Sequence, residues 1–91
     1  MNIYLPHIGY VVKVVRITAV PDEIPNAAAW VKREDENMSI IHLPQDAPPP
    51  VILHEIIHVL WNICKDRHMD FLEEKEHMAY LAQYIMVEIL P

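Results

Sequence analysis

Cysteine and basic residues are both scarce in this 91-residue sequence, which has one cysteine and seven lysines and arginines. A single cysteine cannot form an internal disulfide, and a reduced, cytoplasmic setting is expected. Cys64 falls in an apolar stretch and is predicted to be a buried free thiol. The formal net charge is −6, and the basic residues are scattered. We expect no nucleic-acid partner, because proteins that bind the phosphate backbone usually carry a basic patch.

Long hydrophobic runs are also missing. No apolar stretch approaches the roughly 18 residues of a membrane span, so no membrane partner is expected. The N-terminus has no basic flank followed by an apolar core, and no signal peptide is expected. Hydrophobic residues nevertheless make up 53% of the chain, which is enough for the core of a single small domain over residues 1–91. In so short a chain, a bound metal would add directly to the free energy of folding.

The first half of the chain predicts a small sheet. Residues 10–20 are rich in β-branched side chains and predict an inner strand, followed by a proline-bounded loop at 21–25. Residues 27–33 are ambiguous, because three alanines favour helix while a tryptophan and a valine favour strand. The polar run 34–37 before the apolar residues 38–43 favours a hairpin, so 27–33 is predicted to be a strand.

The second half predicts two helices, at about 50–65 and 71–90. The first is apolar on nearly all sides, which is typical of a buried helix. Its narrow polar strip, which indicates a cleft, consists of His54, Glu55, His58, Asn62 and Lys65. Asp70 and Glu73 fit a capping box, and the short connection predicts an antiparallel helical hairpin. The expected fold is α+β: an antiparallel or mixed sheet of about three strands, over about residues 3–43, packed on this hairpin.

The motif His54-Glu55-Ile56-Ile57-His58 lies inside the first helix. Residues four apart share one face of a helix, so the two imidazoles can bind one Zn²⁺ at about 2.0–2.1 Å per nitrogen. Glu55 is roughly 100° round the helix from His54, beside the predicted metal, where it can take a proton from a bound water. The alternative is two core histidines with a surface glutamate between them.

A third ligand is expected from the second helix. Glu76 lies on the apolar side of the helical wheel, in line with Leu72 and Ala79, and an acid on an inward stripe needs a partner. Counted along an antiparallel hairpin, Glu76 is also level with His58. The alternatives, which are less favoured, are His77, Glu73, Glu74, His42 and His68.

The segments His54-Glu55-x-x-His58 and Glu76-x-x-Ala79-Tyr80 resemble the zincin metallopeptidases of the gluzincin-like type, over about residues 50–90. The likeness is greatest to the short metallopeptidases of phages and prophages, and is more distant to the ImmA/IrrE-type family. This resemblance implies a minimal zincin with one Zn²⁺ per chain, ligands His54, His58 and Glu76, and Glu55 as general base. It also implies a peptide substrate along an edge strand, for which Met38–Leu43 is the candidate.

The leading hypothesis is therefore zinc-dependent hydrolysis of a peptide bond, in which Glu55 activates a zinc-bound water. Tyr80 is a candidate oxyanion stabiliser, although an aromatic at the cleft edge is the favoured interpretation. The first alternative is a catalytically silent module that zinc stabilises and that binds a partner protein. The second alternative is an interaction protein without a metal.

Overall fold

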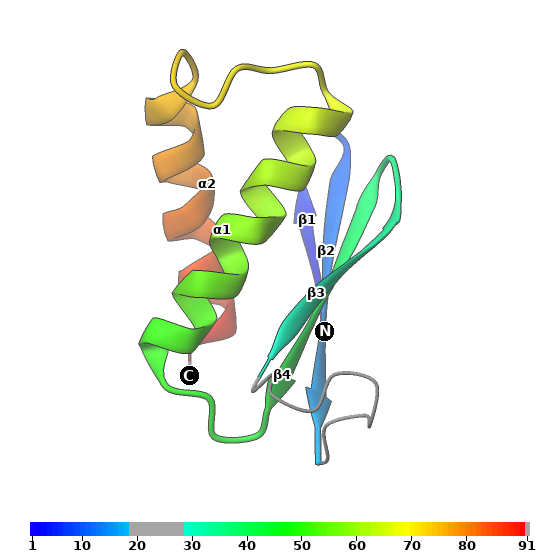
Figure 1. Ribbon diagram of the computed structural model, residues 1–91, viewed down its shortest axis with the longest axis vertical. Coiled ribbons are helices and arrows are strands. Elements are labelled where there is room, and N and C mark those ends of the chain that lie inside the picture. Colours follow the sequence, from blue (N-terminus) through cyan, green and yellow to red (C-terminus); the bar gives the residue numbers. More distant parts are fainter. Residues whose placement is uncertain (19–28, 91) are drawn as a thin grey trace.

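Four strands precede two helices in the computed structural model, which describes residues 1–18 and 29–90 (Figure 1). The elements are β1 (Asn2–Leu5), β2 (Tyr10–Ile17), β3 (Trp30–Asp35), β4 (Met38–Pro44), α1 (Pro49–Asp66) and α2 (Lys75–Ile89). The predicted α+β class and the helical hairpin are confirmed. The loop predicted at 21–25 lies outside the described residues.

The described strands form one mixed sheet in the order β1-β2-β4-β3. β1 and β2 pair antiparallel, β2 and β4 pair parallel, and β3 and β4 form the antiparallel hairpin predicted across 34–37. β1 is an additional strand that the sequence did not predict. One prediction was wrong: Met38–Leu43, predicted to be the edge strand, lies inside the sheet as part of β4. β4 pairs with β2 on one side and with β3 on the other, which leaves β3 at the edge. The alternate residues Ser39, Ile41 and Leu43 of β4 are buried under the helices.

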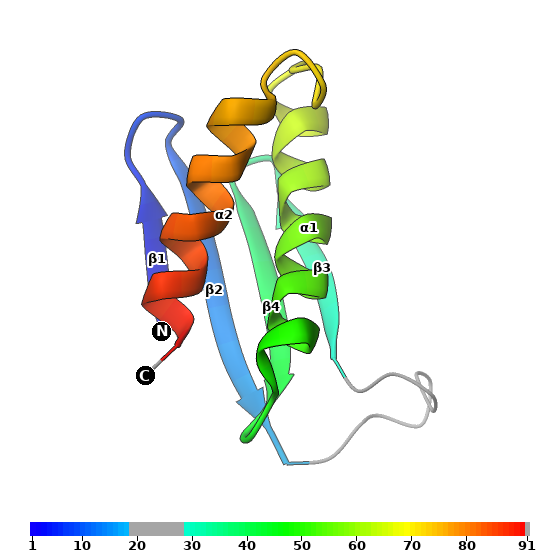
Figure 2. The ribbon, with the colours of Figure 1, turned by 90° about the vertical axis from the view of Figure 1, so that its left-hand side faces the viewer.

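Both helices cover the same face of the sheet (Figure 2). α1 packs over β3 and β4, while α2 packs over β1. The sheet side of α1 consists of Ile52, Ile56, Val59 and Ile63, each at most 2% exposed. Cys64 is buried and free, as predicted, and its Sγ lies 3.5 Å from Sδ of Met78. The helices therefore share a single apolar core with the sheet.

Helix α2 begins later than predicted and is rotated differently. The Asp70 carboxylate accepts hydrogen bonds from the backbone N–H groups of Leu72 and Glu73, as a capping residue does, but these bonds close a turn and the helix starts at Lys75. Its buried residues are Met78, Ile85 and Ile89. The predicted inward residues Leu72, Ala79 and Glu76 are exposed. Apolar side chains occupy most sides of α2, so its pattern alone does not determine which side packs on β1.

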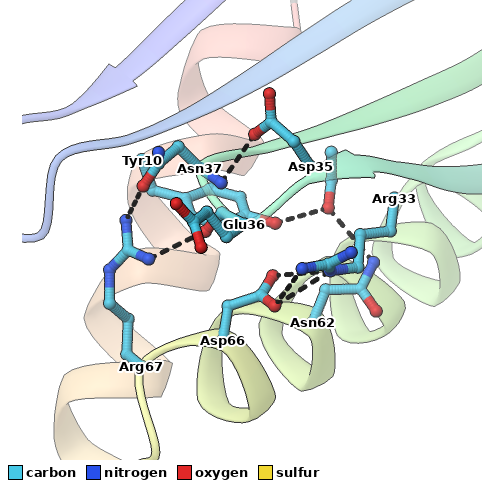
Figure 3. Close-up of polar contacts among 9 residues, drawn as sticks. Tyr10, Arg33, Asp35, Glu36, Asn37, Asn62, Asp66 and Arg67 are labelled. Carbon is cyan, nitrogen blue, oxygen red and sulfur yellow. Dashed lines mark hydrogen bonds and ion pairs between the residues drawn. The ribbon is translucent and has the colours of Figure 1, made fainter.

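Arg67 joins two turns of the sheet to the end of α1 (Figure 3). Its guanidinium donates hydrogen bonds to the backbone oxygens of Ile8, Gly9 and Glu36 and to Oδ1 of Asn37, at 2.8–3.2 Å. It also lies 5.4 Å from the centroid of the Tyr10 ring. A planar guanidinium suits this multiple role because its five donors point in fixed directions. The contacts hold α1 in one position relative to the sheet.

A second link between α1 and the sheet is the ion pair of Asp66 with Arg33 of β3 (Figure 3). Arg33 Nη2 lies 2.7 Å from Asp66 Oδ1, and Arg33 Nε donates to both carboxylate oxygens, at 2.9 and 3.0 Å. The hydrogen bond from Arg33 holds the pKa of the Asp66 carboxyl below its ordinary value. Because the carboxylate is only 5% exposed, Asp66 is held in place on the β3 side of α1.

We predict that Asp66 contributes to the pH dependence of stability. A carboxyl whose pKa is lower in the folded chain stabilises the fold above its unfolded pKa of about 3.9, and this stabilisation is lost as the pH falls through the folded pKa. The wild-type melting temperature should therefore fall steeply below about pH 4. The Asp66→Asn variant should melt lower at pH 7 and fall less on acidification. Asp46→Asn, an exposed control, should follow the wild type. Parallel acid profiles for the wild type and Asp66→Asn would contradict this role.

Candidate metal centre

His54 and His58 meet on the surface of α1. Their Nε2 atoms are 3.2 Å apart, and their ring centroids are 4.9 Å apart with the ring planes at 67°. Two nitrogens bound to one tetrahedral zinc at about 2.0–2.1 Å are about 3.3 Å apart, so the pair fits a single ion. The same separation also permits one imidazole to donate a hydrogen bond to the other. The geometry alone therefore establishes a close histidine pair of the right spacing.

The packing of α1 decides where this pair points. The helix follows Pro48, whose backbone is extended, and has prolines in its first turn, where the ring costs no hydrogen bond. Ile52 and Ile56 are buried against the sheet. His54 is two residues from each, about 200° round the helix, so it points away from the sheet. Both histidines are exposed, as a site that admits an ion and a substrate requires.

Glu55 is buried, with 5% of its surface exposed. Burial raises the pKa of its carboxyl, while positive charge on His54 or His58 would act in the opposite direction. Glu55 lines a cavity of about 300 Å³ together with both histidines. A partly desolvated carboxylate beside two imidazoles is suited to accept a proton.

The other wall of this cavity comes from Asn62 and the beginning of β3, with Ala29, Trp30 and Val31. Asn62, which belongs to the predicted polar strip, donates from Nδ2 to Ser39 Oγ at 3.1 Å. Ser39 Oγ is in turn 2.7 Å from the hydroxyl of Tyr10. This buried polar chain fixes the Asn62 amide. We did not predict Ser39 or Tyr10, although a serine among the alternating apolar residues of 38–43 is a visible signal.

The structure does not bring Glu76 to the histidines. Glu76 is exposed and does not line the cavity, which lies on the β3 side of α1, whereas α2 packs on the opposite flank. The predicted position of Glu76 along the helical hairpin, level with His58, was also wrong. α2 starts at Lys75 rather than near Phe71, so Glu76 is level with the end of α1, while His58 lies eight residues, roughly 12 Å, before that end.

The alternative third ligands are not at the cavity either. His77 lines a different cavity, beside β1. Glu73 and Glu74 are exposed in the turn before α2, and His68 is exposed in the connection. His42 stacks on Trp30 on the face of the sheet opposite the helices, with ring centroids 4.5 Å apart. In residues 1–18 and 29–90, no three His, Cys, Asp or Glu side chains are placed together for a metal.

Tyr80, the candidate oxyanion stabiliser, is on α2 with 68% of its surface exposed, and it lies at two other cavities. The structure therefore gathers three of the predicted site residues, His54, Glu55 and His58. It leaves Glu76 and Tyr80 on the outer side of α2.

Comparisons of the chain with models of protein families, with curated proteins and with solved structures gave no match. The resemblance to gluzincin-like metallopeptidases therefore rests on the motifs of the sequence. Among the described helices, none has the length and apolar character to cross a membrane.

Proposed function

We propose that this chain is a zinc-dependent metallopeptidase with His54 and His58 as metal ligands and Glu55 as general base. The observation that carries the proposal is the 3.2 Å separation of the two Nε2 atoms beside a buried glutamate in one cavity. The alternative of two core histidines with a surface glutamate between them does not account for this arrangement. Both histidines are exposed, and Glu55 between them is buried and faces the cavity.

Zinc at this position would polarise a peptide carbonyl and acidify water. Glu55 would accept a proton from the attacking water and deliver it to the leaving amine nitrogen. Its burial supports this role, because desolvation raises the pKa of the Glu55 carboxyl and so favours its uptake of a proton. Asn62, held by Ser39, would keep the wall beside His58 in place.

The substrate we propose is an extended peptide at the free edge of β3. Among the described strands, β3 pairs only with β4, so its other edge has backbone groups available for a further strand. The beginning of β3 also forms the wall of the cavity that contains Glu55. A peptide hydrogen-bonded to this edge would pass in front of the histidine pair. β3 thus takes the place of Met38–Leu43 in the account of substrate binding.

Chelator-sensitive peptide hydrolysis tests this function. The purified chain loaded with zinc should cleave members of a library of quenched fluorescent peptides, and 1,10-phenanthroline should abolish the cleavage. Addition of zinc after removal of the chelator should restore it. Cleavage that is unaffected by the chelator would point to a contaminating peptidase of another class. Zinc binding without cleavage of any peptide would favour the silent, zinc-stabilised module.

A further inference from the structure

A cavity of about 360 Å³ lies beside β1, on the other side of the molecule's helical layer from the cavity of the histidine pair. One wall is the turn between β1 and β2, and the other wall is α2, which runs next to this turn (Figure 2). The volume falls within the range of about 300–1,000 Å³ that is usual for small-molecule sites. The residues that line the two cavities do not overlap, so a ligand beside β1 is independent of the proposed peptide hydrolysis.

The floor of the cavity beside β1 is apolar. Leu5 is 2% exposed and belongs to the core. Ile8 and Leu81 are partly buried and pack against the core, one from the turn and the other from α2. An apolar floor favours a ligand that covers it with carbon, because this contact removes apolar surface of both partners from water.

Four aromatic side chains line most of the remaining wall of this cavity. His7 comes from the turn, whereas His77, Tyr80 and Tyr84 come from α2. The three residues of α2 are spaced three and four apart, so they share one face of the helix. Tyr80 and Tyr84 are 68% and 47% exposed, and their rings are therefore accessible to a ligand. The face of a tyrosine ring attracts a cation that lies over it.

Two carboxylates lie at the ends of this row of rings on α2. Glu74 Oε2 is 3.9 Å from Nδ1 of His77, just before the helix starts. Glu88 is one turn beyond Tyr84 and lines an adjoining cavity together with Tyr80 and Tyr84. The net charge of the whole chain is −6 with the histidines counted as neutral. The ring faces and the two carboxylates therefore both favour a positively charged ligand.

The neighbouring lysine and arginine are directed elsewhere. Lys75 is two residues from His77, about 200° round α2, and it lines the groove between α1 and α2. Arg67 donates hydrogen bonds to backbone oxygens in two turns of the sheet and lies against the Tyr10 ring. Neither is among the described residues that line the cavity beside β1. Both therefore leave the attraction for a cation at the tyrosine rings in place.

We propose that the cavity beside β1 binds a small organic cation with a methylated ammonium group. Quaternary ammonium groups are the cations that clusters of aromatic rings typically recognise. Their methyl groups can contact the apolar floor while the charge lies against the tyrosine rings. A primary ammonium, such as that of lysine, is compact and strongly hydrated, and it gives up more hydration in an apolar cavity. The methylated cation is therefore the better fit.

NMR titration of the full chain with three small probes tests this proposal, at about pH 8, above the range in which histidine usually titrates. Choline should shift the ring signals of Tyr80 and Tyr84 saturably. It should bind roughly 2- to 30-fold more tightly than 3,3-dimethyl-1-butanol, which has the same shape without the charge. Ethanolamine, which has the charge without the methyl groups, should bind more weakly than choline. Equal affinities for choline and either other probe, or no saturable shift with choline, would overturn the proposal.

Two double variants separate the ring faces from apolar contact. Tyr80→Leu/Tyr84→Leu should keep the wild-type circular dichroism spectrum, because both side chains are exposed, and should lose the preference for choline over the neutral alcohol. Tyr80→Phe/Tyr84→Phe keeps both rings and should keep the preference. The matched control is Tyr4→Leu, which replaces a tyrosine of β1 that is 64% exposed, and it should bind choline as the wild type does. An undiminished preference in the leucine double variant would overturn the role of the rings.

Glu88→Gln tests the contribution of the carboxylate. It should weaken choline binding by roughly 1.5- to 5-fold and leave binding of the neutral alcohol unchanged. Asp46→Asn removes an exposed acid at the other end of the molecule and is the control. An equal loss in both variants would contradict a local role for Glu88. Chelator should not alter choline binding, so a failure of this proposal and a failure of the proposed zinc site are distinguishable.

Discussion

Glu55→Gln should keep zinc and lower peptide hydrolysis by about 10²–10⁴-fold, the usual contribution of a positioned general base. The amide has the shape of the carboxyl but cannot accept a proton from water. Glu55 does not bind the metal in this account, so zinc affinity should change little. The fold should also be retained, because replacing a buried carboxyl with an amide removes the cost of burying a charge. The measurement is the initial rate on the best peptide of the library, with zinc content determined on the same sample.

The matched control is Glu88→Gln, which makes the same exchange at an exposed position of α2. Its rate and zinc content should equal those of the wild type. Should Glu55→Gln cleave the same peptide as fast as the wild type, Glu55 is not the base. If the Glu55→Gln variant loses both zinc and activity, Glu55 contributes to metal binding rather than to proton transfer.

His58→Ala should remove zinc binding and the stability that zinc provides. A ligand at 100 times its Kd stabilises the folded chain by about 2.7 kcal/mol. For a domain of this size, that free energy corresponds to roughly 10–20 °C in melting temperature. The wild type should therefore melt well above its chelated form. His58→Ala should melt at one temperature with and without zinc.

The control for this variant is His7→Ala, which removes an exposed histidine at the cavity beside β1. It should retain the zinc-dependent rise in melting temperature. An equal rise in His58→Ala would show that zinc acts elsewhere on the protein. Because His58 is exposed, the loss should not extend to the chelated protein, whose melting temperature should match that of the chelated wild type.

The parts of the fold that the sequence predicts correctly depend on strong local patterns. The all-round apolar character of 50–65 predicted a buried helix, and α1 is Pro49–Asp66. The polar strip on that helix predicted a cleft, and His54, Glu55, His58 and Asn62 do line one cavity. Four-residue spacing on a helix is enough to bring the two imidazoles together, so this part of the site needs no tertiary information.

The predictions that were wrong concern features that depend on packing between segments distant in the sequence. β1 contributes Ile3 and Leu5 to the core, and its four residues are too short a pattern to predict a strand. Without β1, nothing in the sequence indicates which side of α2 is buried, and Glu76 was placed on the wrong side. The edge position was misassigned for a similar reason. The pairing of β2 with β4 joins residues about 27 apart, and no local signal in 38–43 reveals it.

The zinc content of the purified wild type tests the central claim most directly. Elemental analysis after reconstitution and gel filtration should give about one zinc per chain, with little or none in His58→Ala purified in the same way. That result would support the histidine pair as the metal site. A wild type that remains free of zinc after reconstitution would contradict the account. The 3.2 Å contact would then be a hydrogen bond between two imidazoles, and Glu55 a buried acid without a metal beside it.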